Sequence, residues 1–137
     1  MKEKKLVILI DDDSVCNRIN QLLIKKKFKS DDASDYEVLT FQKPVEGLKY
    51  LIKSLKNKVY RKILVLLDIN MPVMSGWELL EQYSSIPKHE TEVVIYILSS
   101  SIYKGDLESV NQNPIVAEFI SKPITPNAIE KFLKKME

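Results

Sequence analysis

The chain has 137 residues, about the length of one domain, and its 45% hydrophobic and 29% charged residues suit a packed core with a solvated surface. Its 21 Lys and Arg residues nearly balance 19 Asp and Glu residues, and the net charge of +2 argues against nucleic-acid binding through bulk charge. One Cys cannot form an internal disulfide, and every apolar run is far shorter than the ~20 residues that cross a bilayer, so we expect a cytoplasmic protein without membrane contact.

Apolar runs and helical spacing alternate along the chain. Nearly continuous apolar runs at 6–10, 63–67, 93–98 and 116–120 predict strands covered on both faces, and the more polar run at 37–41 predicts an edge strand. Between them, apolar residues recur at helical spacing, as expected of amphipathic helices that cover a sheet. The apolar helix faces comprise Val15, Ile19, Leu22 and Leu23; Val45, Leu48, Leu51, Ile52 and Leu55; Trp77, Leu80 and Tyr83; Leu107 and Val110; and Ile129, Phe132, Leu133 and Met136. The predicted helix starts are Asp13 or Ser14, Pro44, Ser75, and Thr125 with Pro126.

Five strand–helix repeats predict a single α/β domain. Parallel strands need long right-handed crossovers, so helices should cover both faces of one sheet. We expect a flavodoxin-like, doubly wound fold whose five parallel strands have the order 2-1-3-4-5. The polar segment 29–36 is predicted to be a surface loop of this domain.

Polar residues stand directly after four of the predicted strands. Three aspartates at 11–13 follow the first strand, and Asp68 follows the third. Three serines at 99–101 follow the fourth strand, and Lys122 follows the fifth. Ligands of open parallel sheets bind at the carboxyl ends of the strands, where the strand order reverses. We therefore expect these groups to form one site.

The residue types at this edge indicate a chemistry. Carboxylates that converge on one crevice repel one another unless a cation or a proton intervenes. An all-oxygen acidic cluster favours a hard cation, most simply Mg²⁺. The Lys122 ammonium and the Ser99 hydroxyl could then join the cation in neutralising a phosphoryl group. Asp68 could act as a nucleophile at such a site and become an acyl phosphate.

Four short motifs surround these residues: ILIDDDS at 8–14, LLDINMPVMSG at 66–76, ILSSS at 97–101 and FISKP at 119–123. Together and in this order they resemble the receiver domains of two-component response regulators, and the similarity runs from about 5 to 137. The resemblance implies a single receiver domain over 1–137 with no output domain. It also implies that the chain is not an enzyme beyond its own phosphorylation and dephosphorylation.

The resemblance further implies a role for each matching position. Asp68 would accept the phosphoryl group, and Mg²⁺ (or Mn²⁺) would be bound by Asp11, Asp12, Asp68 and the backbone carbonyl of Asn70. Ser99, Ser100, Lys122 and Phe119 would bind the phosphoryl group or switch with it, and Asn70 and Ser101 would tune dephosphorylation. Two positions depart from the usual pattern, because Ser99 stands where Thr is commoner and Phe119 lacks the hydroxyl of the Tyr often found there.

The implied partners are proteins. A sensor histidine kinase or a histidine phosphotransfer protein would donate the phosphoryl group. An unknown downstream protein would recognise the surface of the fourth helix, fifth strand and fifth helix, and we expect no nucleic-acid or membrane partner. The sequence specifies neither the input signal nor the target, the oligomeric state or the lifetime of the phosphorylated form.

Three other interpretations of the same residues stay open. The aspartates at 11–13 could cap a helix, and Asp13 is the one best placed to do only that. The same segment fits the short Asp-x-Asp signature of haloacid-dehalogenase-like phosphatases, although the later acidic pair of those enzymes looks incomplete here. The chain could also be a receiver-like adaptor that binds its partner without phosphorylation.

Overall fold

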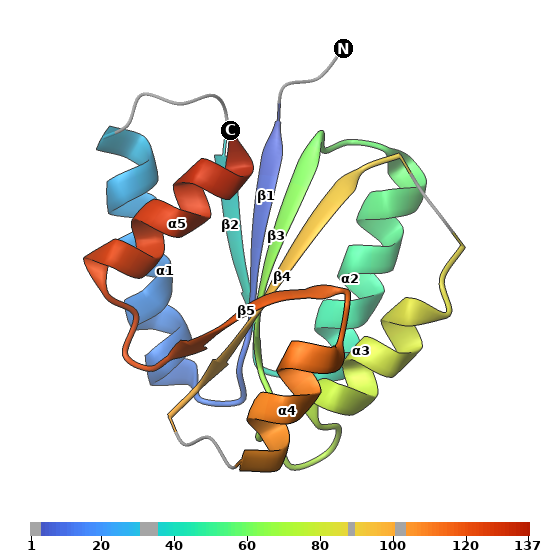
Figure 1. Ribbon diagram of the computed structural model, residues 1–137. Helices are drawn as coiled ribbons and strands as arrows, with labels where there is room; N and C mark the ends of the chain where they lie inside the picture. The colour runs from blue at the N-terminus through green and yellow to red at the C-terminus, as the bar shows by residue number, and fades with distance from the viewer. Residues whose placement is uncertain (1–3, 31–35, 88–89, 101–103) are drawn as a thin grey trace.

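The computed structural model describes residues 4–30, 36–87, 90–100 and 104–137. The five strands are parallel and have the order β2-β1-β3-β4-β5, which confirms the predicted order (Figure 1). The strands are β1 (Lys5–Ile10), β2 (Tyr36–Phe41), β3 (Lys62–Asp68), β4 (Glu92–Ser99) and β5 (Val116–Ser121). The helices are α1 (Ser14–Ser30), α2 (Pro44–Asn57), α3 (Gly76–Ser84), α4 (Lys104–Gln112) and α5 (Pro126–Met136).

The sheet separates two apolar cores. α1 and α5 cover one face, and α2, α3 and α4 cover the other (Figure 1). Successive residues of β1 point to opposite faces, so Val7 packs in the core shared with α1 and α5 whereas Ile8 packs in the core shared with α2 and α3. The residues of β3 from Ile63 to Leu67 are all buried in the same alternating way. Burial on both faces explains why these central strands have continuous apolar sequences.

The four predicted helix starts are confirmed. Asp13 Oδ1 accepts hydrogen bonds from two first-turn amides of α1 at 3.0 and 3.1 Å, as a helix cap does. Ser75 and Glu78 form a capping box at the start of α3. Pro44 and Pro126 occupy the first turns of α2 and α5, where the missing N–H would have had no partner within the helix.

The predicted packing of α1 through its apolar residues is wrong. Val15, Ile19 and Leu22 are 65%, 52% and 52% exposed, and together we call them the α1 ridge. Leu23 beside them is 40% exposed. The buried side of the helix instead comprises Asn17, Asn20, Ile24 and Phe28.

Polar residues face the sheet in the first turns of α1 because backbone carbonyls at the strands bind them. Asn17 Nδ2 donates to the carbonyl oxygens of Asp11 (2.8 Å) and Phe41 (3.2 Å). Gln21 Nε2 donates to the carbonyl oxygen of Val38 at 3.0 Å. Buried backbone groups need hydrogen-bond partners, and here side chains of α1 supply them. Apolar spacing contains no information about such partners, so it assigns the wrong side of the helix to the core.

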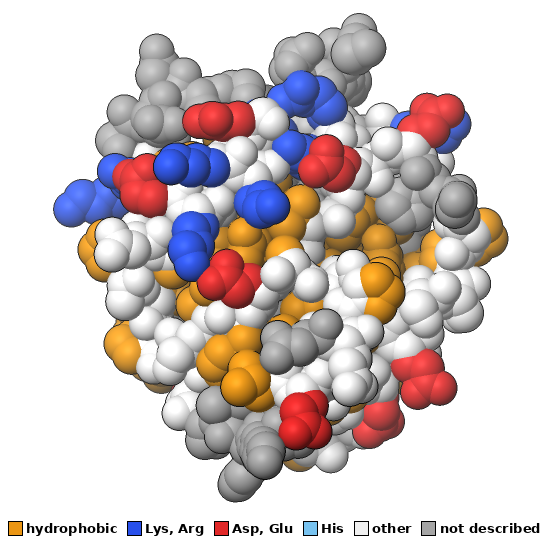
Figure 2. Space-filling model, viewed as in Figure 1, with side chains coloured by type: hydrophobic (Ala, Val, Ile, Leu, Met, Phe, Trp, Pro, Cys, Tyr) orange, Lys and Arg blue, Asp and Glu red, His pale blue; other side chains and the backbone are white. Residues whose placement is uncertain are grey.

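Side chains of opposite charge are interspersed on the face of the molecule that carries α5 (Figure 2). Lys131 Nζ lies 2.8 Å from Glu118 Oε1, and Lys27 Nζ lies 2.6 Å from Glu130 Oε1. Exposed pairs of this kind contribute about 0–1 kcal/mol each to the stability of a folded protein, so their main effect is on the charge of the surface. Among the helices that the structure describes, none combines the length and apolar character needed to cross a membrane.

The start of α3 lies directly against the end of β3. The backbone N–H of Gly76 donates to the carbonyl oxygen of Ile69 at 3.1 Å. A Cβ atom on Gly76 would lie 2.7 Å from the carbonyl oxygen of Asp68 and 2.8 Å from the Cα of Ile69. These are backbone atoms, which cannot turn aside as the tip of a side chain can. Only glycine therefore permits this close approach beside Asp68.

We expect Gly76→Ala to lower the free energy of unfolding by about 2 kcal/mol, as at other overpacked sites. Gly47→Ala is the matched control, because its Cβ would lie 2.7 Å from Cδ1 of Ile10, a side-chain atom that can move. Its helical position also gains from alanine, so its stability should change by less than about 1 kcal/mol. Urea unfolding followed by circular dichroism measures both changes, and equal losses would contradict this explanation.

Candidate functional site

Three carboxylates meet at the carboxyl edge of the sheet, which is the lower edge in Figure 1. Asp11 and Asp12 follow β1, Asp68 ends β3, and one carboxylate oxygen from each lies within 4.8 Å of the others. Asp11 and Asp68 are only 4% and 6% exposed, whereas Asp12 is exposed. The predicted convergence of these aspartates is therefore present, with two of them shielded from water.

Hydrogen bonds of the β1–α1 loop fix the position of Asp11. Its backbone N–H donates to the carbonyl oxygen of Phe41 at 3.1 Å, and its own carbonyl oxygen accepts from Asn17 at 2.8 Å. Its Oδ1 accepts from the backbone N–H of Asp13 at 2.9 Å. Asp13 acts as the helix cap, so the three aspartates have different surroundings, and only Asp11 and Asp12 point into the acidic cluster.

Lys122 supplies the positive charge of the site. Its Nζ lies 2.5 Å from Asp11 Oδ2 and 3.7 Å from Asp68 Oδ2. The backbone N–H of Lys122 donates to the carbonyl oxygen of Ser99 at 2.9 Å, which ties the ends of β4 and β5 together, and the peptide bond to Pro123 is cis. Burial alone would lower the pKa of Lys122, but its hydrogen bond to Asp11 and the nearby carboxylates outweigh burial and raise it. The side chain is therefore a stable ammonium.

The surroundings of Asp68 disfavour its ionised form. Burial is the largest cause and raises the pKa of this carboxyl to about 6, while Lys122 opposes the shift and Asp11 adds to it. The backbone N–H of Asn70 donates to Asp68 Oδ1 at 3.3 Å and favours the carboxylate. Another cation near Asp68 would favour ionisation further, because opposite charges lower the pKa of a carboxyl.

Asn70 and Ser99 stand beside this cluster. Ser99 is 1% exposed, and its Oγ accepts a hydrogen bond from Asn70 Nδ2 at 3.3 Å. Ser100 is exposed at the end of β4. Ser101, predicted to tune dephosphorylation, lies outside the described residues. The side chain of Asn70, two residues after Asp68, thus reaches the hydroxyl of Ser99.

Phe119 lies in β5 away from the carboxylates. Its side chain is partly buried and packs against the core under α3 and α4. With Leu107 and Val110 it lines a cavity of about 460 Å³ between α4 and β5. The cavity is large enough to leave room for a change in the position of the ring.

The donor set of the acidic cluster fits a divalent cation. With all four groups ionised, Asp11, Asp12 and Asp68 exceed the single charge of Lys122 by two negative charges. All of the candidate ligand atoms are oxygens, which suits a hard cation that keeps some of its water ligands. The exposure of Asp12 leaves one side of the cluster open to solvent.

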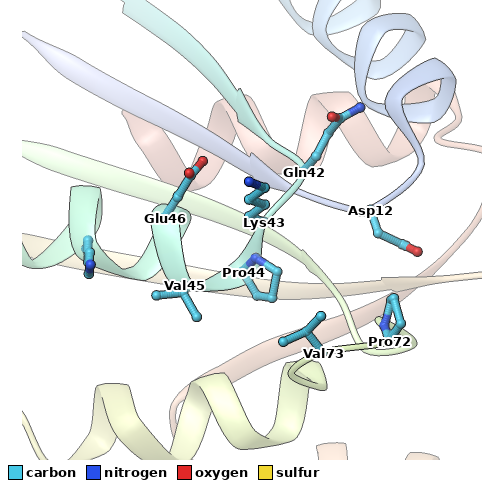
Figure 3. A pocket seen from close by; sticks show the side chains of 9 residues that line it. Asp12, Gln42, Lys43, Pro44, Val45, Glu46, Pro72 and Val73 are labelled. Carbon is cyan, nitrogen blue, oxygen red and sulfur yellow. The ribbon is translucent and has the colours of Figure 1, made fainter.

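A cleft of about 370 Å³ opens beside the acidic cluster (Figure 3). Pro44 and Val45 at the start of α2 line one side, and Pro72 and Val73 of the β3–α3 loop line the other. Asp12 also lines the cleft, and Val73 is 82% exposed at its rim. A molecule that covers Asp12 from the solvent side therefore also covers this apolar opening.

Sequence reasoning missed Asn17, the residue of α1 that holds the loop carrying Asp11 and Asp12. Its side chain is 3% exposed and donates to the ends of both β1 and β2. A signal was available, since Asn17 and Asn20 recur at helical spacing opposite the apolar residues. Their polarity made that side of the helix resemble a solvated face.

Comparisons with known proteins agree with this geometry. The sequence model of the response regulator receiver domain matches residues 7–134. The structure is similar to a two-component response regulator from Cytophaga hutchinsonii, with 25% identity, a TM-score of 0.78 and coverage of 98% of both chains. It is also similar to a response regulator receiver protein from Dyadobacter fermentans DSM 18053, with 21% identity, a TM-score of 0.73 and coverage of 96% of this chain and 97% of that one.

Two further likenesses concern the fold and the length of the chain. The fold is similar to that of the Mn(2+)-bound form of response regulator Rcp1, with 20% identity, a TM-score of 0.64 and coverage of 97% of this chain and 91% of that one. In sequence, the chain is 28% identical over 131 residues to the probable transcriptional regulator ycf29 of Porphyra purpurea. That match covers 95% of this chain and 55% of the relative, so the chain spans about half the length of this curated protein.

We expect Asp12→Asn to raise the free energy of unfolding by about 1 kcal/mol in EDTA, the size of the repulsion between two unit charges ~4 Å apart in water. In excess Mg²⁺ the unaltered chain should become more stable than Asp12→Asn, because a bound cation stabilises only a chain whose site is complete. Thermal unfolding in EDTA and in Mg²⁺ measures both effects. Glu108→Gln removes an exposed carboxylate of α4 and serves as the control. If Mg²⁺ stabilises all three proteins equally, Asp12 is not a ligand.

Proposed function

The chain belongs to the family of response regulator receiver domains, whose sequence model matches residues 7–134, and from this premise we propose that it is a phospho-acceptor switch of a two-component or phosphorelay pathway. The observation that carries the proposal is the convergence of three carboxylates within 4.8 Å, with Lys122 beside two of them. Receiver domains are in general not classical enzymes, and the product of this reaction is a changed protein surface.

Asp68 is the proposed acceptor. One of its carboxylate oxygens attacks the phosphorus of a phosphohistidine, a P–O bond forms, and the P–N bond breaks. The electron pair of the broken bond stays on the imidazole nitrogen, which takes a proton from solvent. Lys122 pairs with the phosphoryl oxygens that gain charge, and the Ser99 hydroxyl donates to another after it leaves Asn70.

Asp11, Asp12 and Asp68, with the backbone carbonyl of Asn70, would hold Mg²⁺ or Mn²⁺. The ion would supply positive charge that neutralises the phosphoryl oxygens and lowers the pKa of Asp68. Asp11 is held by Lys122 at 2.5 Å, so its contact with the cation is proposed to pass through a water molecule. The excess negative charge of the cluster supports this assignment.

Phosphorylation would change the surface formed by α4, β5 and α5. The added negative charge draws Lys122 and the hydroxyl of Ser99 toward Asp68, and Ser99 ends β4 immediately before the segment that leads to α4. Phe119 would follow into the cavity beside Leu107 and Val110. A downstream protein that recognises this surface would then distinguish the two states.

The phosphohistidine donor is proposed to dock on the α1 ridge. Val15 lies in the first turn of α1, directly after the acidic loop, and Ile19 and Leu22 continue the ridge along the helix. Exposed apolar residues at i, i+4 and i+7 suit packing against another helix. A helical sensor kinase or histidine phosphotransfer protein seated there would have its histidine close to Asp68.

Other expectations from the sequence stay predictions. These are the extent of the receiver domain over 1–137, the role of Ser101, the cytoplasmic location, and the lack of nucleic-acid and membrane partners.

We expect acetyl phosphate with Mg²⁺ to label the chain at one position and Asp68→Asn to abolish the label, because the amide cannot attack phosphorus. Mass spectrometry of intact protein and of peptides measures both results. Asp11→Asn is the informative companion variant. It should retain slow labelling, since the acceptor is intact while a cation ligand is altered.

Two outcomes would contradict the proposed function. Steady hydrolysis of a phosphate ester that survives Asp68→Asn but not Asp11→Asn would indicate a haloacid-dehalogenase-like phosphatase. A downstream protein that binds with the same affinity before and after treatment with beryllofluoride, a mimic of the phosphoryl group, would indicate a constitutive adaptor.

We expect Ile19→Asp to slow phosphoryl transfer by about tenfold, because a charge would be buried in the apolar contact. The transfer is measured with a sensor kinase that labels the unaltered chain. Labelling by acetyl phosphate should not change, since this small donor does not touch the ridge. Gln82→Asp adds the same charge to an exposed position of α3, on the other side of the sheet from α1, and serves as the control (Figure 1). Equal transfer to both variants would exclude the ridge as the docking surface.

A further inference from the structure

Asn17 joins α1 to the ends of two strands. Its side chain is 3% exposed, and its Nδ2 donates to the carbonyl oxygen of Asp11 at 2.8 Å and to that of Phe41 at 3.2 Å. The backbone N–H of Asp11 donates to the same carbonyl of Phe41 at 3.1 Å. One amide group thus holds the ends of β1 and β2 in a fixed relation to the first turns of the helix.

These contacts enclose the loop that carries the acidic cluster. The side chain of Asn17 binds the carbonyl of Asp11, and its backbone N–H donates to the carbonyl of Asp13 at 3.0 Å. Asp12 lies between these two attachment points. The bond to Asp13 is the i to i−4 bond of the helix, which any residue would make, whereas the bond to Asp11 depends on the asparagine side chain. Outer residues that orient the ligands of a metal commonly change its affinity when they are replaced.

The side chain of Asn17 donates its two hydrogen bonds at a cost to stability. Asn17 Oδ1 is buried and has no hydrogen-bond partner among the described residues, which lowers stability. Rotating the amide by 180° would point Oδ1 at the two carbonyl oxygens, where it has no donor. In either orientation, therefore, Oδ1 has no partner in the part of the chain that the structure describes, while Nδ2 faces one side only. A leucine of nearly the same shape would remove the unpaired Oδ1, but it would leave the carbonyl oxygen of Asp11 without the donor that Asn17 supplies. What the asparagine contributes at this position is therefore the pair of donated hydrogen bonds that hold the ends of β1 and β2.

We propose that Asn17 is a positioning residue for the divalent-cation site, acting through the backbone of Asp11. The inference rests on the proposed function, because it assumes that Asp11, Asp12 and Asp68 hold the cation. Asn17 itself does not touch the carboxylates in this arrangement. It sets where Asp11 and Asp12 stand before any cation arrives.

The test replaces each buried asparagine of α1 by leucine and measures Mn²⁺ binding by electron paramagnetic resonance. Asn20 is the matched control, since it lies one turn further along the helix, is 5% exposed, and its Nδ2 contacts Cys16 Sγ at 3.5 Å instead of the loop backbone. We expect Asn17→Leu to weaken Mn²⁺ binding about tenfold, as loss of a residue that orients ligands does, while Asn20→Leu stays within about twofold of the unaltered chain.

Urea unfolding in EDTA separates positioning from stability. Asn17→Leu removes an unpaired buried oxygen but also leaves the carbonyl oxygen of Asp11 without its donor, so its stability is measured beside that of Asn20→Leu. Under conditions in which both variants are fully folded, Asn17→Leu should still bind Mn²⁺ more weakly. Asn17→Ala provides a second variant with the same expected loss of affinity if leucine prevents folding.

Three results would overturn the inference. Asn17 variants could bind Mn²⁺ as tightly as the unaltered chain, or Asn20→Leu could lose as much affinity as Asn17→Leu. In both cases the proposed function would stand without this role for Asn17. Failure of the unaltered chain to bind Mn²⁺ would overturn both the role of Asn17 and the proposed function.

Discussion

Negative charge held at one edge of a parallel sheet is the constraint on which the site depends. The parallel order of β1 and β3 brings Asp11 and Asp68 together, and burial removes the water that would otherwise weaken their repulsion. Lys122 offsets part of this charge from the end of β5, at 2.5 and 3.7 Å from the two carboxylates. The remaining excess of negative charge would favour a bound cation, and through it the phosphoryl group of the proposed function.

Much of this arrangement could be predicted from local patterns in the sequence. Strands buried on both faces need continuous apolar residues, so β1, β3 and β4 stand out, and caps such as Asp13 and Ser75 mark where helices begin. Alternation of strands and helices then implies a parallel sheet, and a parallel sheet brings all strand ends to one edge. The clustering of Asp68 with the first two aspartates follows from that topology rather than from any single motif.

The features that could not be predicted depend on contacts between distant residues. The orientation of α1 depends on Asn17, whose partner at Phe41 lies 24 positions away and is a backbone atom common to every residue type. The close approach at Gly76 depends on how α3 meets the end of β3, where a Cβ would lie 2.7 Å from a carbonyl oxygen. Neither contact leaves a periodic pattern in the sequence.

α1 carries both the α1 ridge and Asn17, whose side-chain amide donates hydrogen bonds to the acidic loop and to the end of β2. The α1 ridge and Asn17 lie on opposite sides of α1. A bound protein that displaced this helix would therefore also displace the backbone of the acidic loop. Binding equilibria that share such an element are thermodynamically linked, and linkage is reciprocal. A phosphohistidine donor that binds α1 in the position favourable for cation binding would increase the affinity of the site for the cation. The cation would then increase the affinity for the donor by the same factor.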